Sequence, residues 1–405
     1  MPNLAEWNNC CGCSACATKC PKVAIRMTSN HEGFLHPVVD ANLCVECGAC
    51  EKTCPGLASE KVIINSPKAY IVQHKNDTIR YQSTSGGAFT VIAEEIIRRG
   101  GVVFGAAMTD NLTVKHVCVT SIEDLARFRN SKYVQSEIGN CYRETKERLI
   151  SGQWVCFSGT PCQINGLYKY LSVDYEKLIA VDVVCKSVPS PLVFNKYIEY
   201  KKRSEGSIAD VVFRDKKRGF FYCTMAHYAT HEDRLMSKEV YRRGSESDEW
   251  LRLFLSGMIS RRSCMNCSYQ TMDRVGDFTL GDIWETGHKE LDDNKGSTLV
   301  HVWTEKGKTF LESVKPNVRC VEFPIEKSRG ANRTNTLKLK PNREQLFEDA
   351  NSLDSKVFFE KYTPYTAKVC MKQYGRYTLW KLHLHNLVRH VKHLIIHRPH
   401  KYLIE

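Results

Sequence analysis

The sequence lacks the two kinds of apolar segment that direct a chain into or across a membrane. Residues 1–9 carry neither the basic stretch nor the apolar stretch of a secretory signal peptide. No run of about 18 apolar residues occurs, which is the length that a membrane span requires. We therefore expect a cytoplasmic protein, whose 19 cysteines remain thiols in a reducing compartment.

Motifs that bind nucleotides and nucleic acids are also missing. No Gly-x-Gly-x-x-Gly follows any predicted strand, so a Rossmann nicotinamide site is not supported. Gly307-Lys308-Thr309 resembles the end of a phosphate-binding loop, but Val302 stands where the first glycine of that loop would be. No stretch interleaves aromatic and basic residues in the manner of single-strand channels, and we expect no nucleic-acid partner.

The cysteines are concentrated near the N-terminus. The chain has 405 residues, enough for two or three domains, and its 42% hydrophobic and 25% charged residues are ordinary for a globular protein. Nine of the 19 cysteines lie between Cys10 and Cys54 inclusive. A disulfide-bonded protein of this length would distribute paired cysteines along its loops, whereas clustered triplets are typical of metal ligation.

One cysteine pattern occurs twice in this N-terminal part of the chain. The run Cys10-x2-Cys13-x2-Cys16-x3-Cys20-Pro21 recurs as Cys44-x2-Cys47-x2-Cys50-x3-Cys54-Pro55. In bacterial two-cluster ferredoxins, three cysteines of such a run bind one 4Fe–4S cluster and the fourth crosses to the other cluster. We therefore predict two clusters. The ligands of the first set are Cys10, Cys13, Cys16 and Cys54, and those of the second set are Cys44, Cys47, Cys50 and Cys20.

Zinc is the main alternative for these cysteines. Structural zinc usually binds two separated cysteine pairs, so two complete copies of a triplet with a distant fourth ligand favour iron–sulfur clusters. Cys11 fits neither set, and we expect it to pack as a small apolar side chain. His31 and His36, in a predicted turn and short strand between the two runs, are expected to be structural.

Downstream of Pro67 the sequence predicts alternating strands and helices. Strands at 69–75 and 102–108 flank a glycine-rich turn and a helix at 84–101, whose apolar residues recur at helical spacing. Residues 154–171 and 299–314 each predict a strand, a turn and a helix, and 178–191 predict a buried strand that ends in a turn. The fold class is therefore an α+β ferredoxin-like two-cluster module fused to an α/β core.

Two turns of this core could bind an anion or a metal. The segment 83–87, Ser-Thr-Ser-Gly-Gly, begins a predicted helix, where hydroxyl and amide groups can bind a phosphate. An ordinary helix cap with a glycine turn is the alternative. Asp273, Asp277 and Asp282 also lie near glycines, and we expect them to be structural because aspartate is common in turns.

Four core cysteines are candidates for a third metal site. Cys162, Cys185, Cys264 and Cys267 could bind another cluster; the alternative is buried packing, with a lone zinc or nothing at the Cys264–Cys267 pair. The remaining cysteines are isolated in the sequence and are predicted to pack. They are Cys118, Cys141, Cys156, Cys223, Cys320 and Cys370.

Six collinear motifs resemble one known family. They are STSGGAF (83–89), NSKYVQSE (130–137), FSGTPCQINGL (157–167), VDVVCKSVPSP (181–191), FRDKKRG (213–219) and RSCMNC with RVGDFTLGDIW (262–284). Together they resemble the coenzyme F420 hydrogenase/dehydrogenase beta-subunit family, over roughly residues 1–310 when the fused ferredoxin module is included. Lys186-Ser187 follows Cys185 where the family pattern has glycine.

The resemblance implies an iron–sulfur flavoprotein with FAD in its core. It implies a third 4Fe–4S cluster on Cys162, Cys185, Cys264 and Cys267. It also implies that two segments surround the flavin. These contribute Ser85, Gly86 and Gly87 from the turn, and Ser131, Lys132, Tyr133, Gln135 and Ser136 from the second segment.

These implications lead to a function hypothesis. Clusters carry single electrons, whereas FAD accepts them singly and delivers a hydride, so the chain is expected to be an FAD- and 4Fe–4S-dependent oxidoreductase. Its partners would be ferredoxin or another redox protein, and a deazaflavin coenzyme or small organic substrate. The alternatives are a non-catalytic electron-transfer subunit and a zinc-bound scaffold. The sequence identifies neither the substrate, the direction of electron flow nor a catalytic residue.

The C-terminal tail carries much of the net charge of +13. Residues 366–405 contain eight Lys or Arg, six His and one Glu. Trp380, Leu384, Leu387, Val388, Val391 and Ile395 form an apolar helical stripe. Such a helix can pack on the domain, lie at the inner face of a membrane or bind an acidic partner.

The domains are accordingly predicted as three regions. The ferredoxin module is 1–60 and the tail is 366–405. The flavin-binding core is 66–365, with parts at about 66–150 and 151–365.

Overall fold

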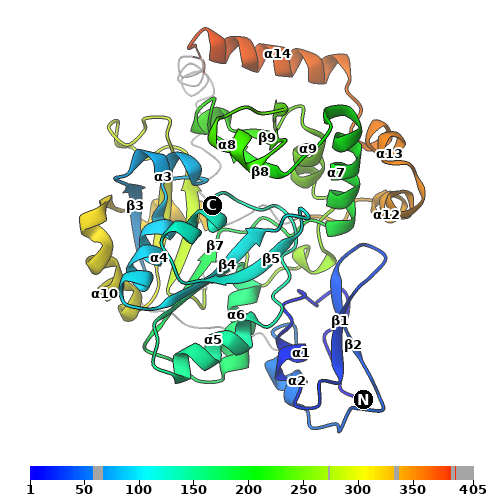
Figure 1. Ribbon diagram of the computed structural model, residues 1–405, viewed down its shortest axis with the longest axis vertical. Helices are drawn as coiled ribbons and strands as arrows, with labels where there is room; N and C mark the ends of the chain where they lie inside the picture. The colour runs from blue at the N-terminus through cyan, green and yellow to red at the C-terminus, as the bar shows by residue number, and fades with distance from the viewer. Residues whose placement is uncertain (58–66, 272–273, 333–336, 385–387, 389–405) are drawn as a thin grey trace.

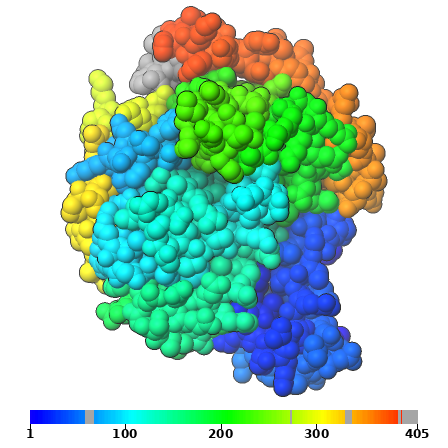
Figure 2. Space-filling view, in the orientation of Figure 1, coloured from blue at the N-terminus to red at the C-terminus, as the bar shows by residue number. Residues whose placement is uncertain are grey.

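The computed structural model describes residues 1–57, 67–271, 274–332, 337–384 and 388, with backbone alone for 329–332. Figure 1 shows a small N-terminal module beside a large sheet layered with helices, and a second, smaller sheet above it. Figure 2 shows the N-terminal module protruding from one side of the molecule. None of the described helices combines the length and the apolar content that crossing a bilayer requires.

The N-terminal module consists of two short helices and a hairpin. Its elements are α1 (Ala15–Lys19), β1 (Ile25–Ser29), β2 (Leu35–Val39) and α2 (Ala49–Thr53). The strands pair antiparallel, with Ile25 opposite Val39. The two helices begin at equivalent positions of the two cysteine runs, so the duplication in the sequence is also a duplication of structure.

The core is built on an eight-stranded mixed sheet with the order β13-β3-β12-β11-β7-β6-β4-β5. The four central strands β4, β6, β7 and β11 run parallel to one another. The pairs on either side of them are antiparallel. The strands are β3 (Lys68–His74), β4 (Val102–Met108), β5 (Val114–Val119), β6 (Val155–Gly159), β7 (Leu178–Val183), β11 (Phe278–Ile283), β12 (Ser297–Val302) and β13 (Val318–Phe323). The mixed α/β character predicted for the core is confirmed.

Helices cover both faces of this sheet because its central strands are apolar on both sides. Val103 and Cys156 pack under α4 (Ala88–Arg98) and α10 (Glu305–Val314). Their neighbours Phe104 and Phe157 pack in another cluster with α5 (Cys141–Ile150) and α6 (Pro161–Leu171). The remaining helices near the sheet are α3 (Asp77–Gln82), α11 (Ile325–Asn332) and the 3-10 turns Glu123–Phe128 and Lys315–Asn317.

A second hydrophobic core lies between a small sheet and four helices (Figure 1). The sheet has the antiparallel order β10-β9-β8, and Trp250 lies fully buried in the adjacent core. Its strands are β8 (Asp210–Asp215), β9 (Thr224–Tyr228) and β10 (Tyr241–Gly244). The four helices are α7 (Pro191–Glu205), α9 (Glu249–Ser256), α12 (Arg343–Ser352) and α13 (Ser355–Tyr362). The short α8 (His231–Leu235), which buries no residue, and 3-10 turns at Phe220–Tyr222 and Arg262–Cys264 belong to the same region.

The C-terminal helix α14 (Ala367–Lys381) lies against the small-sheet region. Arg376 donates to Glu246, and the Arg218 guanidinium lies 4.8 Å from the ring centre of Tyr377. The helix ends at Lys381 because His383 adopts a left-handed φ of 56°. Of the predicted apolar stripe, Leu387, Val391 and Ile395 lie outside the described residues.

Candidate functional site

The two cysteine runs fold into the same loop. Gly12 and Ser14 have left-handed φ values of 69° and 65°, and Glu46 and Gly48, at the equivalent positions of the second run, have 52° and 68°. Two left-handed residues around a central cysteine turn the backbone sharply twice before the short helix begins. Each loop can therefore direct closely spaced thiols to one side, which is what a triplet of cluster ligands needs.

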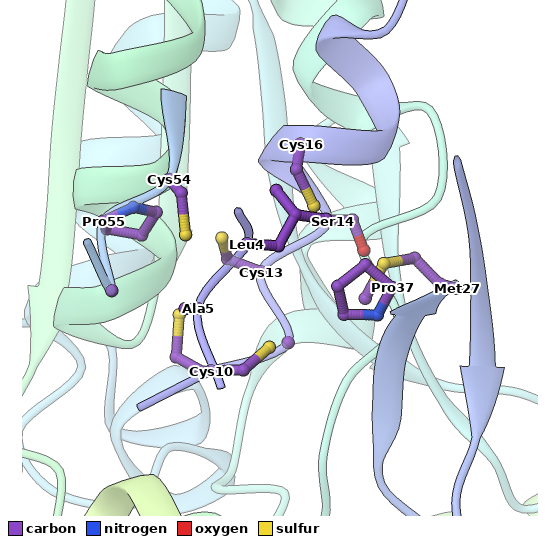
Figure 3. A pocket seen from close by; sticks show the side chains of 13 residues that line it. Leu4, Ala5, Cys10, Cys13, Ser14, Cys16, Met27, Pro37, Cys54 and Pro55 are labelled. Atoms are coloured by element: carbon purple, nitrogen blue, oxygen red, sulfur yellow. The ribbon is translucent and has the colours of Figure 1, made fainter. Parts of the chain in front are cut away.

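The first set of cysteines surrounds one cavity. Figure 3 shows Cys10, Cys13, Cys16 and Cys54 around it, together with the apolar residues that line it. The first three are 7–8% exposed. The structure thus brings Cys54 of the second run to the triplet of the first run, as the crossed ligation pattern requires.

The chemistry of this cavity fits a cationic iron–sulfur core. Burial, followed by the neighbouring thiols of Cys10 and Cys54, raises the pKa of Cys16 to about 12. Uncompensated thiolates would therefore be disfavoured here, whereas a bound metal deprotonates its cysteine ligands outright. The donor set and the cavity fit a 4Fe–4S cluster.

The second set of cysteines is closer to solvent. Cys50 is buried, Cys44 and Cys20 are half-buried, and Cys47 is exposed. Leu43 and Val45, on either side of Cys44, are 52% and 55% exposed. The second set therefore lies at an open, partly apolar end of the module.

Single-metal sites are not formed within the described part of the chain. No three of its His, Cys, Asp or Glu side chains are grouped so that one metal ion could bind them. Each thiolate of a four-iron cluster binds a different iron, so a cluster site does not need its sulfurs to converge on one point.

The four core cysteines come together from three segments. Cys162 lies in the first turn of α6, Cys185 follows β7, and Cys264 ends a 3-10 turn shortly before Cys267. Burial and the thiols of Cys264, Cys162 and Cys267 hold the pKa of Cys185 well above its usual range. The structure thus groups all four, although Cys162 and Cys267 lie far apart in the sequence.

Cys11 lies between the first set and these core cysteines. A hydrogen bond with the Cys13 thiol raises the pKa of Cys11, and a hydrogen bond with the Cys162 thiol lowers it. Gly166 lies one helical turn after Cys162, and a Cβ at this glycine would lie 3.0 Å from the Cys13 sulfur. One face of α6 therefore presents Cys162 and a gap for Cys13 to the N-terminal loop. Cys11 packs as predicted, but it does so at the contact between two candidate centres.

The glycine-rich turn is more closed than a phosphate-binding loop. The Gly86 amide donates to the Thr298 hydroxyl at 2.9 Å, and a Cβ there would lie 2.1 Å from the Val72 carbonyl oxygen. Gly87 caps α4 with a φ of 86°. The two glycines therefore serve close packing and a helix start. Ser85 donates to Asp282 at 2.8 Å.

The second predicted flavin segment begins at this turn. The hydroxyl groups of Thr84 and Ser131 are 2.9 Å apart. The Lys132 ammonium donates to the carbonyl oxygens of Arg127 and Arg129 at 2.8 and 3.0 Å, and burial lowers its pKa to about 7. Tyr133 stacks on the ring of Phe254 in the second core, and its hydroxyl adjoins Ser131.

The far end of the same segment reaches the N-terminal module. The Gln135 side chain accepts from the Leu35 amide at 3.1 Å, and its amide nitrogen lies 2.5 Å from where a Cβ of Gly12 would be. Ser136 accepts from Gln163, the residue after Cys162. Segment 131–136 therefore connects the glycine-rich turn with the loop of the first cysteine set.

Two segments of the chain match known protein families. Residues 152–328 match the family described as the C terminus of the coenzyme F420 hydrogenase/dehydrogenase beta subunit. Residues 9–58 match the 4Fe-4S dicluster domain. The predicted resemblance is confirmed. The chain combines a 4Fe–4S dicluster region with a beta-subunit region of the F420 hydrogenase/dehydrogenase type, and iron–sulfur electron transfer is its class of function. A search of curated proteins finds no match.

Solved structures give a weaker likeness. Thirteen chains match. One belongs to the F420-reducing NiFe hydrogenase complex from Methanosarcina barkeri, with a TM-score of 0.45 and 15% sequence identity, over 76% of this chain and 94% of that chain.

Within the beta-subunit region, Arg214 was not singled out from the sequence. Its guanidinium pairs with Asp282 and lies 5.4 Å from the ring centre of Trp284, which is 46% exposed. Arg214 is buried, and its Nη2 has no hydrogen-bond partner among the described residues. A buried cation with a spare donor beside an exposed aromatic ring fits a planar, anionic cofactor. The motif FRDKKRG contained Arg214, so the family motif was the available signal.

The aspartates of the 274–285 turn divide into two roles. Asp277 is buried and accepts from the Ala180 amide and the Thr304 hydroxyl, at 2.8 and 2.6 Å, so its structural role is confirmed. Asp282 binds Ser85 and Arg214 instead. Asp273 lies outside the described residues.

Proposed function

We propose that the chain is an oxidoreductase that depends on 4Fe–4S clusters and FAD and moves electrons between a one-electron carrier and a two-electron partner. The partner would be a deazaflavin coenzyme or an organic substrate. When bound, the clusters supply one-electron transfer, and FAD supplies the exchange between single electrons and a hydride.

The contact between the first cysteine set and α6 is the observation that carries this proposal. Cys13 lies against Gly166, and Cys11 adjoins Cys162. A relay module that only bound metal would not need this contact with a second group of cysteines. The two N-terminal sets and the four core cysteines would hold three clusters in succession.

The flavin is proposed near the glycine-rich turn. Ser85, Thr84 and Ser131 supply hydroxyl groups there, and Arg214 supplies a cation with a free donor. Lys132 and Tyr133 would act by fixing the segment, because their polar and aromatic groups already have partners in the protein. Gly86 and Gly87 would act by letting β3 and β12 approach this turn.

A second candidate is a subunit that delivers electrons to another protein. The exposed Cys47 and the apolar side chains of Leu43 and Val45 favour a redox protein, such as a ferredoxin, at the second set. Steady reduction of a small substrate by the isolated chain would contradict this candidate.

Cofactor content is the first measurement. Protein purified without oxygen should hold about twelve irons per chain and one FAD, since each cubane holds four irons. About eight irons without flavin would contradict the FAD-dependent function and favour the electron-transfer subunit. Zinc in place of iron would contradict both.

Paired variants separate the proposed sites. Cys54→Ala should remove about four irons, because it deletes a ligand of the first set, whereas Cys118→Ala should leave the iron content unchanged. Arg214→Gln should lower FAD occupancy at unchanged iron content, and Arg252→Gln, which removes an arginine bonded to Thr363 and Pro364, should not. Equal FAD occupancy in both arginine variants would remove Arg214 from the flavin site.

A further inference from the structure

Arg261 joins the third cysteine group to the first. Its backbone belongs to the core cysteine loop, where the amide donates to Val188 at 2.9 Å and the carbonyl accepts from Cys264 at 3.0 Å. Its side chain crosses to the N-terminal module, where Nε donates to the Cys10 carbonyl at 2.7 Å and Nη2 donates to the Leu35 carbonyl at 2.8 Å.

The guanidinium also contacts a predicted ligand sulfur. Its Nη2 lies 3.6 Å from the Cys10 sulfur and within hydrogen-bond distance of it. The remaining nitrogen, Nη1, has no hydrogen-bond partner among the described residues. A Cβ at Gly12, which lines the cavity of the first set, would lie 2.8 Å from this nitrogen. Nη2 is thus shared among the Leu35 carbonyl, the His36 ring nitrogen at 3.0 Å and the Cys10 sulfur, and Nη1 is a spare donor at the cavity wall.

No carboxylate in the described part of the chain pairs with this charge. Arg261 is 1% exposed and forms no ion pair with a described carboxylate, whereas the nearby Arg262 and Arg343 both pair with Glu32. A buried cation is costly unless an anion compensates it. Four thiolates outweigh the positive charge of an iron–sulfur core, so a cluster in the first set would supply that anion.

The second set lacks an equivalent cation among the residues that the structure describes. The Cys20 sulfur accepts from the Ala24 amide at 3.3 Å, and backbone amides also act on Cys50. Among the described residues, no arginine or lysine side chain donates to a sulfur of the second set. The two sets therefore differ in the charge that adjoins their ligands.

We propose that Arg261 is a positioning residue that raises the reduction potential of the first N-terminal centre. This inference rests on the proposed function, because it requires a cluster in each set. Reduction adds negative charge to a centre, and a fixed positive charge with N–H donors at its sulfurs stabilises the reduced state. Arg261 thereby favours electrons at the first set, next to the core cysteines, over the exposed second set.

The test is a redox titration of the full chain followed by electron paramagnetic resonance. Arg261→Met should lower the reduction equilibrium constant of one N-terminal centre at least tenfold. For a one-electron couple, this lowers the reduction potential by about 59 mV. The other N-terminal centre serves as an internal reference and should shift much less. Arg261→Lys keeps the charge and should shift the potential by less than half as much.

A matched variant separates the effect of the Arg261 charge from the effect of the contact between the N-terminal module and the core. Arg343→Met combined with Glu32→Gln removes a buried contact between the same two parts without leaving a charge and without touching a cysteine. It should leave both potentials unchanged. Equal shifts in this variant and in Arg261→Met, or no shift in Arg261→Met with full iron content, would overturn the inference. Absence of both N-terminal clusters from the unsubstituted protein would instead contradict the proposed function. If Arg261→Met does not retain its iron, the titration of Arg261→Lys tests the inference. A shift of the second N-terminal centre in Arg261→Lys, with no shift of the first, would also overturn the inference.

Discussion

The two cysteine sets share a loop conformation but have different surroundings. Gly12 and Ser14 correspond to Glu46 and Gly48, with the same left-handed backbone. Cys10, Cys13 and Cys16 of the first set are buried near α6 and Arg261, whereas the second set includes the exposed Cys47. A duplicated sequence can therefore place two equivalent ligand sets in unequal environments, because the core covers only one of them.

The difference depends on how firmly the module binds the core. Glu32, between the two strands of the module, is fully buried and forms a two-pronged pair with Arg343 of α12. Ser190 donates to the Glu32 carbonyl, and Asn351 donates to the His31 carbonyl at 2.8 Å. These contacts hold the turn at residues 31 and 32 against the core through its backbone and through the Glu32 carboxylate.

The largest expected effect comes from breaking this pair. Arg343→Met leaves the buried Glu32 carboxylate with the partly exposed Arg262 and with His31 at 4.0 Å, and breaking a buried ion pair typically costs about 3–5 kcal/mol. We expect the cluster-loaded protein to lose its visible absorbance at a clearly lower urea concentration. The double variant with Glu32→Gln should recover most of the loss. An unchanged urea midpoint in the single variant would show that the module does not depend on this pair.

An intermediate effect is expected from a chelator. Iron should leave the second set at least about tenfold faster than the first, which corresponds to about 1.4 kcal/mol of additional protection. Iron release to a coloured chelator should then show two phases. Cys47→Ser should lose the fast phase, since it removes the exposed ligand. A single phase, or loss of the slow phase in Cys47→Ser, would mean that burial of Cys10, Cys13 and Cys16 does not protect their centre.

Much of the ligand arrangement could be predicted because it is local. The spacing of each run groups its own cysteines, and the crossing of Cys54 follows from the pattern. The strands near 69–75 and 102–108 were also predicted, because short apolar runs that follow Pro67 and Gly100-Gly101 favour strands. The glycine-rich turn and helix predicted over 84–101 are confirmed as well, since the helix begins at Ala88 after a turn that packs under β12.

What the sequence could not predict depends on distant contacts. Arg261 lies 251 positions from Cys10, and nothing in its local sequence distinguishes it from the adjacent Arg262. The small sheet was missed because all residues of β8 and β9 are buried, so neither strand shows the alternation that identifies a half-buried strand.

The smallest effect concerns the contact of α1 with α6. Lys19 donates to the Tyr170 carbonyl at 2.9 Å and to the Ser172 hydroxyl at 3.2 Å, and the second run has Thr53 at the equivalent position. Lys19→Ala should lower the free energy of unfolding by about 0.5–1.5 kcal/mol, the usual contribution of such a hydrogen bond. Lys52→Ala, on the exposed side of α2, should have no measurable effect in the same urea titration. The slow phase of iron release should accelerate in Lys19→Ala alone, because Lys19 bonds the end of α6 whereas Lys52 is exposed. Equal behaviour of the two variants would mean that the protection comes from the Glu32–Arg343 side of the module.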